Sequence, residues 1–268
     1  MRKIVKRFLN RFGLDIKRIS KMTSSAECCG SYFMEAGRFV IEFERVELRG
    51  NTYFVPKYSI HRPAVKSLIV GRLYEPETHR FVSEFCSSFN GSMVHAGTFF
   101  GDMLPSFSRS VSGYVYAFEP VLENYVLAKL CVEFNELKNV ILMNCALSDG
   151  MHNVYIDTYE SDGRHAGGGS RVSDKGVISA SVSIDQLCIE DLVLIQLDVE
   201  GHELKALRGA ETTIQKLRPV VAIEDNRGNC SGFLSKMKYQ RVAQIPGLSI
   251  WSPVENNWYK EKVLSILG

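Results

Sequence analysis

Short apolar runs alternate with amphipathic segments along the chain from residue 92 onward. The apolar runs predict strands over residues 93–96, 114–118, 140–144, 193–197 and 220–223. Between them, apolar side chains recur at helical spacing, which predicts helices over residues 122–135 and 204–217. Strands that alternate with helices are typical of an α/β fold, so we expect a mostly parallel, doubly wound sheet with helices on both faces.

The region between the third and fourth predicted strands is less regular. Residues 154–156 and 178–184 have the pattern of short or half-buried strands. They flank a glycine-rich loop over residues 163–171, in which Gly167, Gly168 and Gly169 are consecutive. This loop is either a plain mobile loop or a lid over a substrate pocket, and the sequence leaves both interpretations open.

Residues 1–90 form an N-terminal extension, and we place the α/β domain at residues 91–268. Alternation predicts a strand over residues 38–48, and phenylalanines at helical spacing predict a lead-in helix over residues 77–89. The stretch between these two elements is punctuated by prolines, and we expect it to be irregular.

The first 21 residues carry eight Lys and Arg against one Asp, with apolar residues at helical spacing. This pattern predicts a basic amphipathic helix. Such a helix either packs its apolar face on the domain or a partner, or makes peripheral contact with an anionic membrane surface. A signal peptide is not indicated, because no continuous apolar run follows the basic residues. No later run reaches transmembrane length.

Composition is that of a globular domain: 45% of the 268 residues are hydrophobic and 23% are charged. The formal net charge of +2 gives no signature of nucleic-acid binding. Seven cysteines without a C-x-x-C pair indicate neither a disulfide framework nor a zinc site, and we predict no metal centre. We therefore expect a cytoplasmic protein, with contact at the inner face of the membrane and a homodimer left as open alternatives.

Glycines and one acidic residue stand where a doubly wound sheet binds its ligands, past the carboxyl ends of the strands. Gly97 and Gly101 follow the first predicted strand and let the backbone turn sharply. Their G-x-x-x-G spacing differs from the G-x-G-x-x-G of dinucleotide-binding folds. Glu119 ends the second strand, 22 residues after Gly97, and suits the ribose hydroxyls of an adenosine-type cofactor.

Ionisable side chains gather at the ends of the fourth and fifth predicted strands. Asp198, Glu200 and His202 follow the fourth strand, and Glu224 follows the fifth. Acidic residues at helix starts are one explanation, because they interact favourably with the helix dipole. A carboxylate-rich rim beside the cofactor groove is the other, and we favour a functional role for Asp198.

Several motifs follow one another in a fixed order. They are Val94-His95-Ala96-Gly97-x3-Gly101-Asp102, Ala117-Phe118-Glu119-Pro120, Asn144-Cys145-Ala146-Leu147-Ser148, Ser183-Ile184-Asp185, Leu197-Asp198-Val199-Glu200-Gly201-His202-Glu203, Leu207-Arg208-Gly209-Ala210, Arg218-Pro219 and Ile223-Glu224. Over residues 92–225 this series resembles the FkbM family of methyltransferases. The resemblance implies a class I, Rossmann-like methyltransferase fold that uses S-adenosylmethionine. Known or presumed members mostly O-methylate sugars and other hydroxyl groups in polysaccharides and secondary metabolites.

The resemblance also implies roles for individual residues. Residues 96–102 would face the methionine part of the cofactor, Glu119 would hold the ribose, and Cys145 and Ala146 would lie beside the adenine. One departure is His95, where the family usually has an acidic residue. The implied cofactor-binding set is His95, Ala96, Gly97, Thr98, Gly101, Asp102, Glu119, Pro120, Asn144, Cys145, Ala146 and Asp198.

A hydroxyl acceptor needs a nearby base to take its proton. Our catalytic candidates are Asp198, His202 and Glu224. Glu200, Ser170 and Arg171 are candidates for binding the acceptor, which we expect to contain a sugar or be lipid-linked. Two alternatives stay open: an NAD-dependent oxidoreductase on a similar sheet, and a non-catalytic module that keeps the groove.

Overall fold

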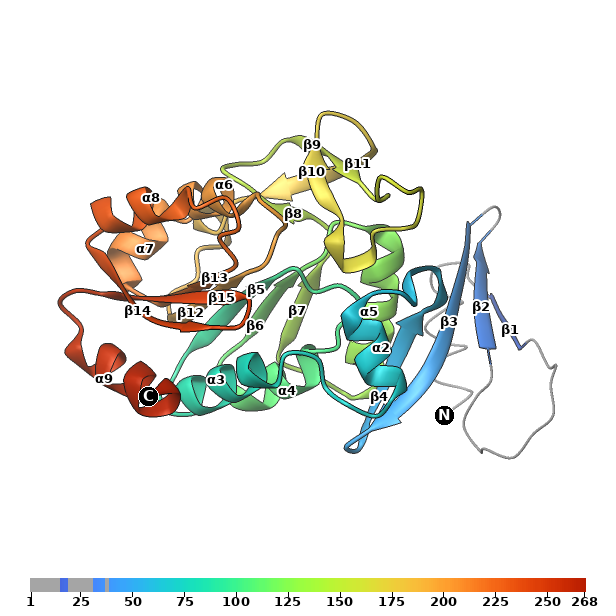
Figure 1. Ribbon diagram of the computed structural model, residues 1–268, viewed down its shortest axis with the longest axis horizontal. Coiled ribbons are helices and arrows are strands. Elements are labelled where there is room, and N and C mark those ends of the chain that lie inside the picture. Colours follow the sequence, from blue (N-terminus) through green and yellow to red (C-terminus); the bar gives the residue numbers. More distant parts are fainter. Residues whose placement is uncertain (1–14, 19–30, 37–38) are drawn as a thin grey trace.

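The computed structural model describes residues 15–18, 31–36 and 39–268 (Figure 1). Within these residues the central sheet has seven strands in the order β14-β15-β13-β12-β5-β6-β7. The five strands from β13 to β7 are parallel, and β15 and β14 join them antiparallel. The parallel strands are β5 (Ser92–Ala96), β6 (Val115–Phe118), β7 (Val140–Met143), β12 (Leu192–Leu197) and β13 (Val220–Ile223). The predicted α/β fold with a mostly parallel sheet is confirmed.

Helices cover both faces of this sheet (Figure 1). This is why the central strands are largely apolar: all six residues of β12 are buried, and only Gln196 among them is polar. One face packs against α3 (Pro76–Cys86), α4 (Leu104–Ser110), α5 (Leu122–Phe134) and α9 (Asn257–Leu267). The other packs against α6 (Glu203–Arg208), α7 (Glu211–Leu217) and α8 (Cys230–Lys236).

The predicted helix over residues 204–217 is two helices, α6 and α7, with a break at Gly209. A Cβ on Gly209 would lie 2.0 Å from the carbonyl oxygen of Ser148, so the chain passes too close for a side chain there. Asp185 then accepts hydrogen bonds from the backbone N–H groups of Thr212 and Thr213, at 3.0 and 2.7 Å, and starts the new helix. Helical periodicity continues across such a break, which is why the sequence pattern does not reveal it.

The N-terminal extension contains a four-stranded antiparallel sheet within the described residues, in the order β1-β2-β3-β4. Its strands are β1 (Asp15–Arg18), β2 (Ser31–Ala36), β3 (Phe39–Leu48) and β4 (Asn51–Pro56). The turn η1 (Lys57–Ser59) and the helix α2 (Pro63–Ile69) follow. The stretch between β3 and α3 was predicted to be irregular, and that prediction is wrong, because β4 pairs with β3 along its whole length.

The predicted basic helix of residues 1–21 falls mostly outside the described residues. Asp15–Arg18, the part that is described, form strand β1 paired antiparallel with β2, so the helix prediction is wrong there. Pairing with a neighbouring strand outweighs the helical periodicity of this short stretch.

The extension is fastened to the domain through α5. Buried side chains of β3, β4 and α2 share one apolar cluster with Phe99, Phe100 and Leu127. The side chain of Asn135 exchanges two hydrogen bonds with the backbone of Thr52, at 2.8 and 2.7 Å. Residues 41–90 and the α/β domain therefore form one continuous core.

A second, smaller sheet lies over one end of the central sheet (Figure 1). Its order among the described strands is β10-β9-β11-β8, formed by β8 (Ala146–Leu147), β9 (Asn153–Asp157), β10 (Arg171–Ser173) and β11 (Val177–Val182). The two predicted strands of this region are β9 and β11. The glycine-rich loop contains a short turn, η2 (Gly167–Gly169), that joins β9 to β10.

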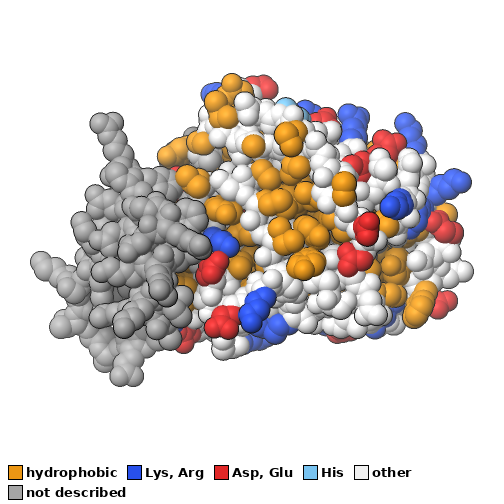
Figure 2. Space-filling model, turned by 180° about the vertical axis from the view of Figure 1, so that it is seen from behind, with side chains coloured by type: hydrophobic (Ala, Val, Ile, Leu, Met, Phe, Trp, Pro, Cys, Tyr) orange, Lys and Arg blue, Asp and Glu red, His pale blue; other side chains and the backbone are white. Residues whose placement is uncertain are grey.

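The last two strands, which precede α9, form a hairpin at the edge of the central sheet. The sequence analysis did not predict the strands β14 (Tyr239–Ile245) and β15 (Leu248–Pro253). At the opposite edge, β7 is incompletely covered, and Ile141 is 38% exposed. Seen from behind, apolar side chains gather on the middle of the molecular surface (Figure 2).

Candidate functional site

Four predicted residues stand in one row at the carboxyl edge of the central sheet. Strand register pairs Ala96 with both Phe118 and Leu197, and Leu197 with Ile223. The next residue on each strand is therefore Gly97, Glu119, Asp198 or Glu224. Parallel pairing thus brings together side chains that are up to 127 positions apart, at the place where doubly wound sheets bind ligands.

Position 97 requires a glycine because the backbone of Asp198 lies too close for a side chain. The φ of Gly97 is +94°, and a Cβ there would lie 1.9 Å from the carbonyl oxygen of Asp198. Asp198 is itself held by a 3.0 Å hydrogen bond from its N–H to the carbonyl of Ala96. The missing side chain lets β5 and β12 stay paired to their ends and leaves the edge above them open.

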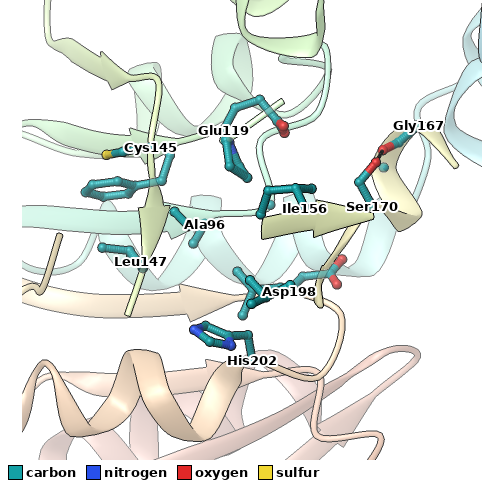
Figure 3. Close-up of a pocket in the computed structure, with 16 residues that line it drawn as sticks. Ala96, Glu119, Cys145, Leu147, Ile156, Gly167, Ser170, Asp198 and His202 are labelled. Carbon is teal, nitrogen blue, oxygen red and sulfur yellow. Dashed lines mark hydrogen bonds between the residues drawn. The ribbon is translucent and has the colours of Figure 1, made fainter. Parts of the chain in front are cut away.

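One pocket, which we call the inner pocket, opens above this row (Figure 3). Glu119 and Cys145 lie on one side of it and His202 on the other, with Asp198 between them. Ser170 and Gly167 lie at its far end. Much of the remaining wall is apolar and comes from Phe118, Ala146, Leu147, Ile156 and Val172. A ligand that joins a flat apolar base to a polar sugar would match this combination of an apolar wall and polar side chains.

Glu119 is buried at the polar end of the inner pocket, with only 4% of its surface exposed. One carboxylate oxygen accepts from the N–H of Phe99 at 2.7 Å, and the other accepts from Val121 N–H at 2.9 Å and Asn124 Nδ2 at 3.3 Å. Burial raises the pKa of Glu119 to about 8, against these hydrogen bonds, which lower it. The oxygen bonded to Phe99 keeps a free lone pair, so Glu119 can still accept from a ligand hydroxyl.

The glycine-rich loop packs directly over the site. A Cβ on Gly168 would lie 3.1 Å from the ring of Phe99, and one on Gly169 would lie 2.8 Å from the guanidinium of Arg62. The side chain of Ser170 donates to the carbonyl of Gly167 at 2.8 Å. Because the loop has three consecutive glycines, its backbone can lie close to the groove, where side chains would not fit.

A second pocket of about 150 Å³, the acidic pocket, adjoins the inner one. The two pockets share Gly97, Gly168 and Asp198 in their walls. Ionisable side chains dominate its lining: Glu75, Asp102, Asp198, Glu200, Glu224 and a single arginine, Arg62. Arg62 lies 3.9 Å from Glu200 and 3.2 Å from Glu160, so part of its charge is already balanced.

Asp198 is buried among three carboxyl groups of this set, those of Glu75, Glu200 and Glu224. Burial raises its pKa well above the usual range, and hydrogen bonding and repulsion from Glu224 raise it further. Its Oδ1 atom is buried and has no hydrogen-bond partner among the described residues. Two carboxyl groups so close together hold a proton between them more readily than two separate carboxylates would.

His95 and Asp102 also line the acidic pocket, as the methionine end of the predicted groove would require. Burial lowers the pKa of His95 to about 4, so its imidazole is neutral, and its Nδ1–H donates to the Gln196 side-chain oxygen. Burial raises the pKa of Asp102 to about 7. This end of the groove therefore has a neutral imidazole on β5.

His202 faces the inner pocket and does not line the acidic one. Its Nε2 is hydrogen-bonded to Ser148 Oγ at 3.0 Å. Burial lowers its pKa to about 4. The structure thus separates His202 from Glu224, with Asp198 standing between the two pockets.

Other predicted residues line neither pocket. Thr98 is 1% exposed and its N–H donates to Phe118, while Gly101 lies against α5, where a Cβ would be 3.1 Å from the Cα of Ala128. The Asn144 side chain donates to the carbonyl of Glu119 at 2.8 Å and so fixes the backbone behind the pocket. Arg171 has a side chain 56% exposed and lies 3.7 Å from Asp157.

Two buried residues that the sequence analysis did not select hold the site in place. Asn124 donates to both Glu119 and the carbonyl of Gly167, each at 3.3 Å, and accepts from the hydroxyl of Tyr58 at 2.8 Å. Glu203 accepts from the N–H groups of Val199 and Gly201, at 3.1 and 3.0 Å. The sequence offers one signal for such residues: each is polar and lies within the first two turns of a helix that follows a strand. Many solvent-exposed residues share this signal.

Among the described residues, no group of three or more His, Cys, Asp or Glu side chains is arranged to hold a metal ion. None of the helices in the described part of the chain is long and apolar enough to cross a membrane.

Solved structures with similar folds include several methyltransferases. One is the methyltransferase FkbM from Methylobacillus flagellatus, with 17% identity and a TM-score of 0.46 over 61% of this chain. The match spans 43% of that protein's length. Another is a methyltransferase from Streptococcus mutans in complex with SAH, with 14% identity and a TM-score of 0.42 over 66% of this chain and 96% of the other. An rRNA methylase from Streptococcus thermophilus has 13% identity and a TM-score of 0.41 over 66% and 95% of the two chains.

No curated protein matches the sequence. The sequence pattern of the "Methyltransferase FkbM domain" does match, over residues 95–241, which is more than half of the chain. This range contains β6, β7, β12 and β13 and the last two residues of β5, and with them Gly97, Glu119, Asp198 and Glu224. The expected cofactor, S-adenosylmethionine, is the one that this match supports. The chain belongs to the FkbM family of methyltransferases, with the class I methyltransferase fold that its sequence motifs predict.

Proposed function

We propose that this chain is an S-adenosylmethionine-dependent O-methyltransferase that methylates a hydroxyl group of a sugar-containing acceptor. The observation that carries the proposal is the position of Asp198, which lines both the inner pocket and the acidic pocket. A residue there can contact a cofactor on one side and an acceptor on the other. Membership in a methyltransferase family favours this function over the oxidoreductase alternative.

The residues of the inner pocket fit the adenosine part of the cofactor. The free lone pair of Glu119 suits a ribose hydroxyl, and the apolar wall beside Cys145 suits the adenine ring. The methionine part would extend past Gly97 into the acidic pocket, near His95 and Asp102. When bound, S-adenosylmethionine supplies an electrophilic methyl group on a sulfonium.

The acidic pocket suits an acceptor with several hydroxyl groups. An ionised carboxylate can accept hydrogen bonds but cannot donate them, whereas a hydroxyl group can donate one. Glu75, Glu200 and Glu224 would orient such an acceptor, while Asp198 takes the proton from the hydroxyl that reacts. Because its pKa is raised, the ionised carboxylate of Asp198 is a stronger base than that of an ordinary aspartate.

These placements refine the three catalytic candidates. Asp198 becomes the proposed base, and Glu224 tunes it by raising its pKa. His202 lines only the inner pocket, so we assign it to the cofactor side of the site. Arg171 is left without an assigned role, because it lies on the surface and pairs with Asp157.

We also propose that the enzyme works in the cytoplasm. The five cysteines in the described part of the chain are free thiols, which suits a reducing compartment. Localising a tagged full-length chain in its host by fractionation checks this directly, and recovery from an oxidising compartment would contradict it.

The test of function has two steps. Calorimetric titration with S-adenosylhomocysteine should show binding, and absence of binding would remove the methyltransferase proposal. Incubation with radiolabelled S-adenosylmethionine and host extract should then place the label on a sugar-containing compound, in a bond stable to mild base. Label on an amine or a protein side chain would contradict O-methylation, and binding without any transfer would favour the non-catalytic module.

A further inference from the structure

A large cavity lies outside both pockets of the methyltransferase site. It has a volume of about 480 Å³, and three arginines from separate segments converge on it. Arg49 comes from the turn between β3 and β4, Arg72 follows α2, and Arg80 lies on α3. We call this the basic cavity. It does not share a lining residue with the inner or the acidic pocket.

The arginines of the basic cavity have hydrogen-bonding capacity to spare. Arg49 and Arg72 make no ion pair or side-chain hydrogen bond within the described part of the chain. Arg80 lies 3.6 Å from Glu84 and donates to the carbonyl of Ile266. No carboxylate is among the described residues that line the cavity. Each guanidinium offers five N–H donors in a planar fork that matches the oxygens of a phosphate group.

A buried histidine in the wall of the cavity points to a ligand independently of the arginines. His79 is only 6% exposed, and neither of its ring nitrogens has a hydrogen-bond partner among the described residues. Leaving both nitrogens of a buried imidazole unpaired is costly. An N–H donor on His79, in a cavity wall that also contains three arginines, favours an anion with several acceptor oxygens.

Apolar side chains at the rim indicate what carries that anion. Val70 is 66% exposed and Ile69 is 41% exposed, and they directly precede Gly71 and Arg72 in the cavity wall. A soluble phosphate has no use for apolar groups beside its binding site. Basic side chains next to exposed aliphatic ones are instead typical of surfaces that meet an anionic lipid interface, where the aliphatic groups enter the acyl boundary.

We propose that the basic cavity binds the phosphate group of an anionic phospholipid and docks this face of the protein on a membrane surface. Arg49 and Arg72 hold the phosphate, and Ile69 and Val70 insert beside it. This inference does not rest on the proposed methyl transfer, because the cavity and the methyltransferase site share no residue.

The test uses the full chain and flotation with lipid vesicles at 0.15 M salt. Vesicles contain either phosphatidylcholine alone or phosphatidylcholine with 30% phosphatidylglycerol. Binding should require the anionic lipid, and the double variant Arg49→Ala/Arg72→Ala should lower the partition coefficient at least about tenfold. Val70→Ser should lower it as well, without any change in charge.

The matched control is Lys216→Ala/Lys236→Ala, which removes the same charge from exposed positions on α7 and α8. Figure 1 shows these helices at the end of the molecule away from the β3–β4 turn. Equal loss of vesicle binding in both double variants would overturn the proposal, since only net charge would then matter. So would unchanged binding in Arg49→Ala/Arg72→Ala. Calorimetry with inorganic phosphate forms a second arm: phosphate binding that depends on Arg49 and Arg72, without vesicle binding, would show a site for free phosphate instead of lipid.

Discussion

Gly97 and Asp198 lie so close at the edge of the central sheet that a Cβ on Gly97 would be 1.9 Å from the carbonyl oxygen of Asp198. Any side chain at position 97 must therefore move the end of β12, and Asp198 with it. The position of the proposed base depends on a glycine that comes 101 residues earlier in the chain.

Gly97→Ala should disturb both stability and cofactor binding. The substitution combines this clash with a φ of +94°, which L-residues rarely adopt, and strain of this kind costs about 1–3 kcal/mol. Thermal unfolding and calorimetry with S-adenosylhomocysteine measure the two effects. Gly232→Ala is the control, because α8 has open space there and alanine favours a helix. Normal binding by Gly97→Ala would show that the edge tolerates displacement.

Asp198→Asn should lose turnover while it keeps affinity for S-adenosylhomocysteine. An amide has nearly the shape of the carboxylate but cannot take a proton, and loss of a general base costs about a hundred- to ten-thousandfold in kcat. Asp191→Asn, at the other end of the same strand, is the matched control and should leave kcat unchanged. If Asp198→Asn turns over at the normal rate, another group takes the proton.

Glu224→Gln should move the pH profile of the reaction to lower pH. Glu224 raises the pKa of Asp198, so removing its charge lets Asp198 lose its proton at lower pH. In a plot of kcat against pH, the acid limb should move to lower pH by a measurable amount, even if the maximal rate falls. An unshifted limb, or a shift to higher pH, would separate Glu224 from the titration of Asp198.

Cofactor binding should release a proton from Glu119 near neutral pH. Its pKa of about 8 without a ligand lies above the usual 4.5, and hydroxyl donors favour the charged form. Calorimetry with S-adenosylhomocysteine at pH 7, in buffers of different ionisation enthalpy, measures the release. Glu119→Gln should abolish it, and the wild-type release should fade above pH 9. The same raised pKa stabilises the free protein at low pH, and that contribution should be lost as pH rises from 4.5 to 8.

Tyr58→Phe should weaken cofactor binding although Tyr58 lines neither pocket. Its hydroxyl holds Asn124, which in turn holds Glu119 and the carbonyl of Gly167. One hydrogen bond of this kind contributes about 0.5–1.5 kcal/mol, so Kd should rise roughly two- to tenfold. Tyr114→Phe, 49% exposed just before β6, is the control. Equal affinities in the two variants would mean that Asn124 keeps its place without Tyr58.

The sequence was most informative where local pattern and tertiary structure agree. The parallel strands were predicted to within one residue at either end, because they are mainly apolar, and a glycine or an acidic residue follows four of the five. The carboxyl-edge row followed from that order, since topology alone aligns Glu119 with Asp198. The order of the sequence motifs over residues 92–225 identified the family.

What the sequence could not reveal depends on contacts between distant segments. The paired strands β3 and β4 cover α5 because Phe54 and Phe100 meet in one core, which no local pattern records. Asn124 looks like any polar helix residue until Tyr58 and Gly167 are placed on either side of it. His202 follows a strand end as Asp198 does, and only the path of the turn puts it in a different pocket.

The hydrogen bonds that run from Tyr58 through Asn124 to Glu119 also bear on how far this protein can be divided. Residues 91–268 contain every strand of the parallel sheet, yet the carboxylate proposed to hold the cofactor is positioned from residue 58. A fragment trimmed to residues 91–268 would therefore lose affinity for its ligand, in addition to losing the apolar cover that α3, β3 and β4 supply. Swapping the N-terminal extension between relatives should consequently alter cofactor affinity, even where the catalytic residues are identical.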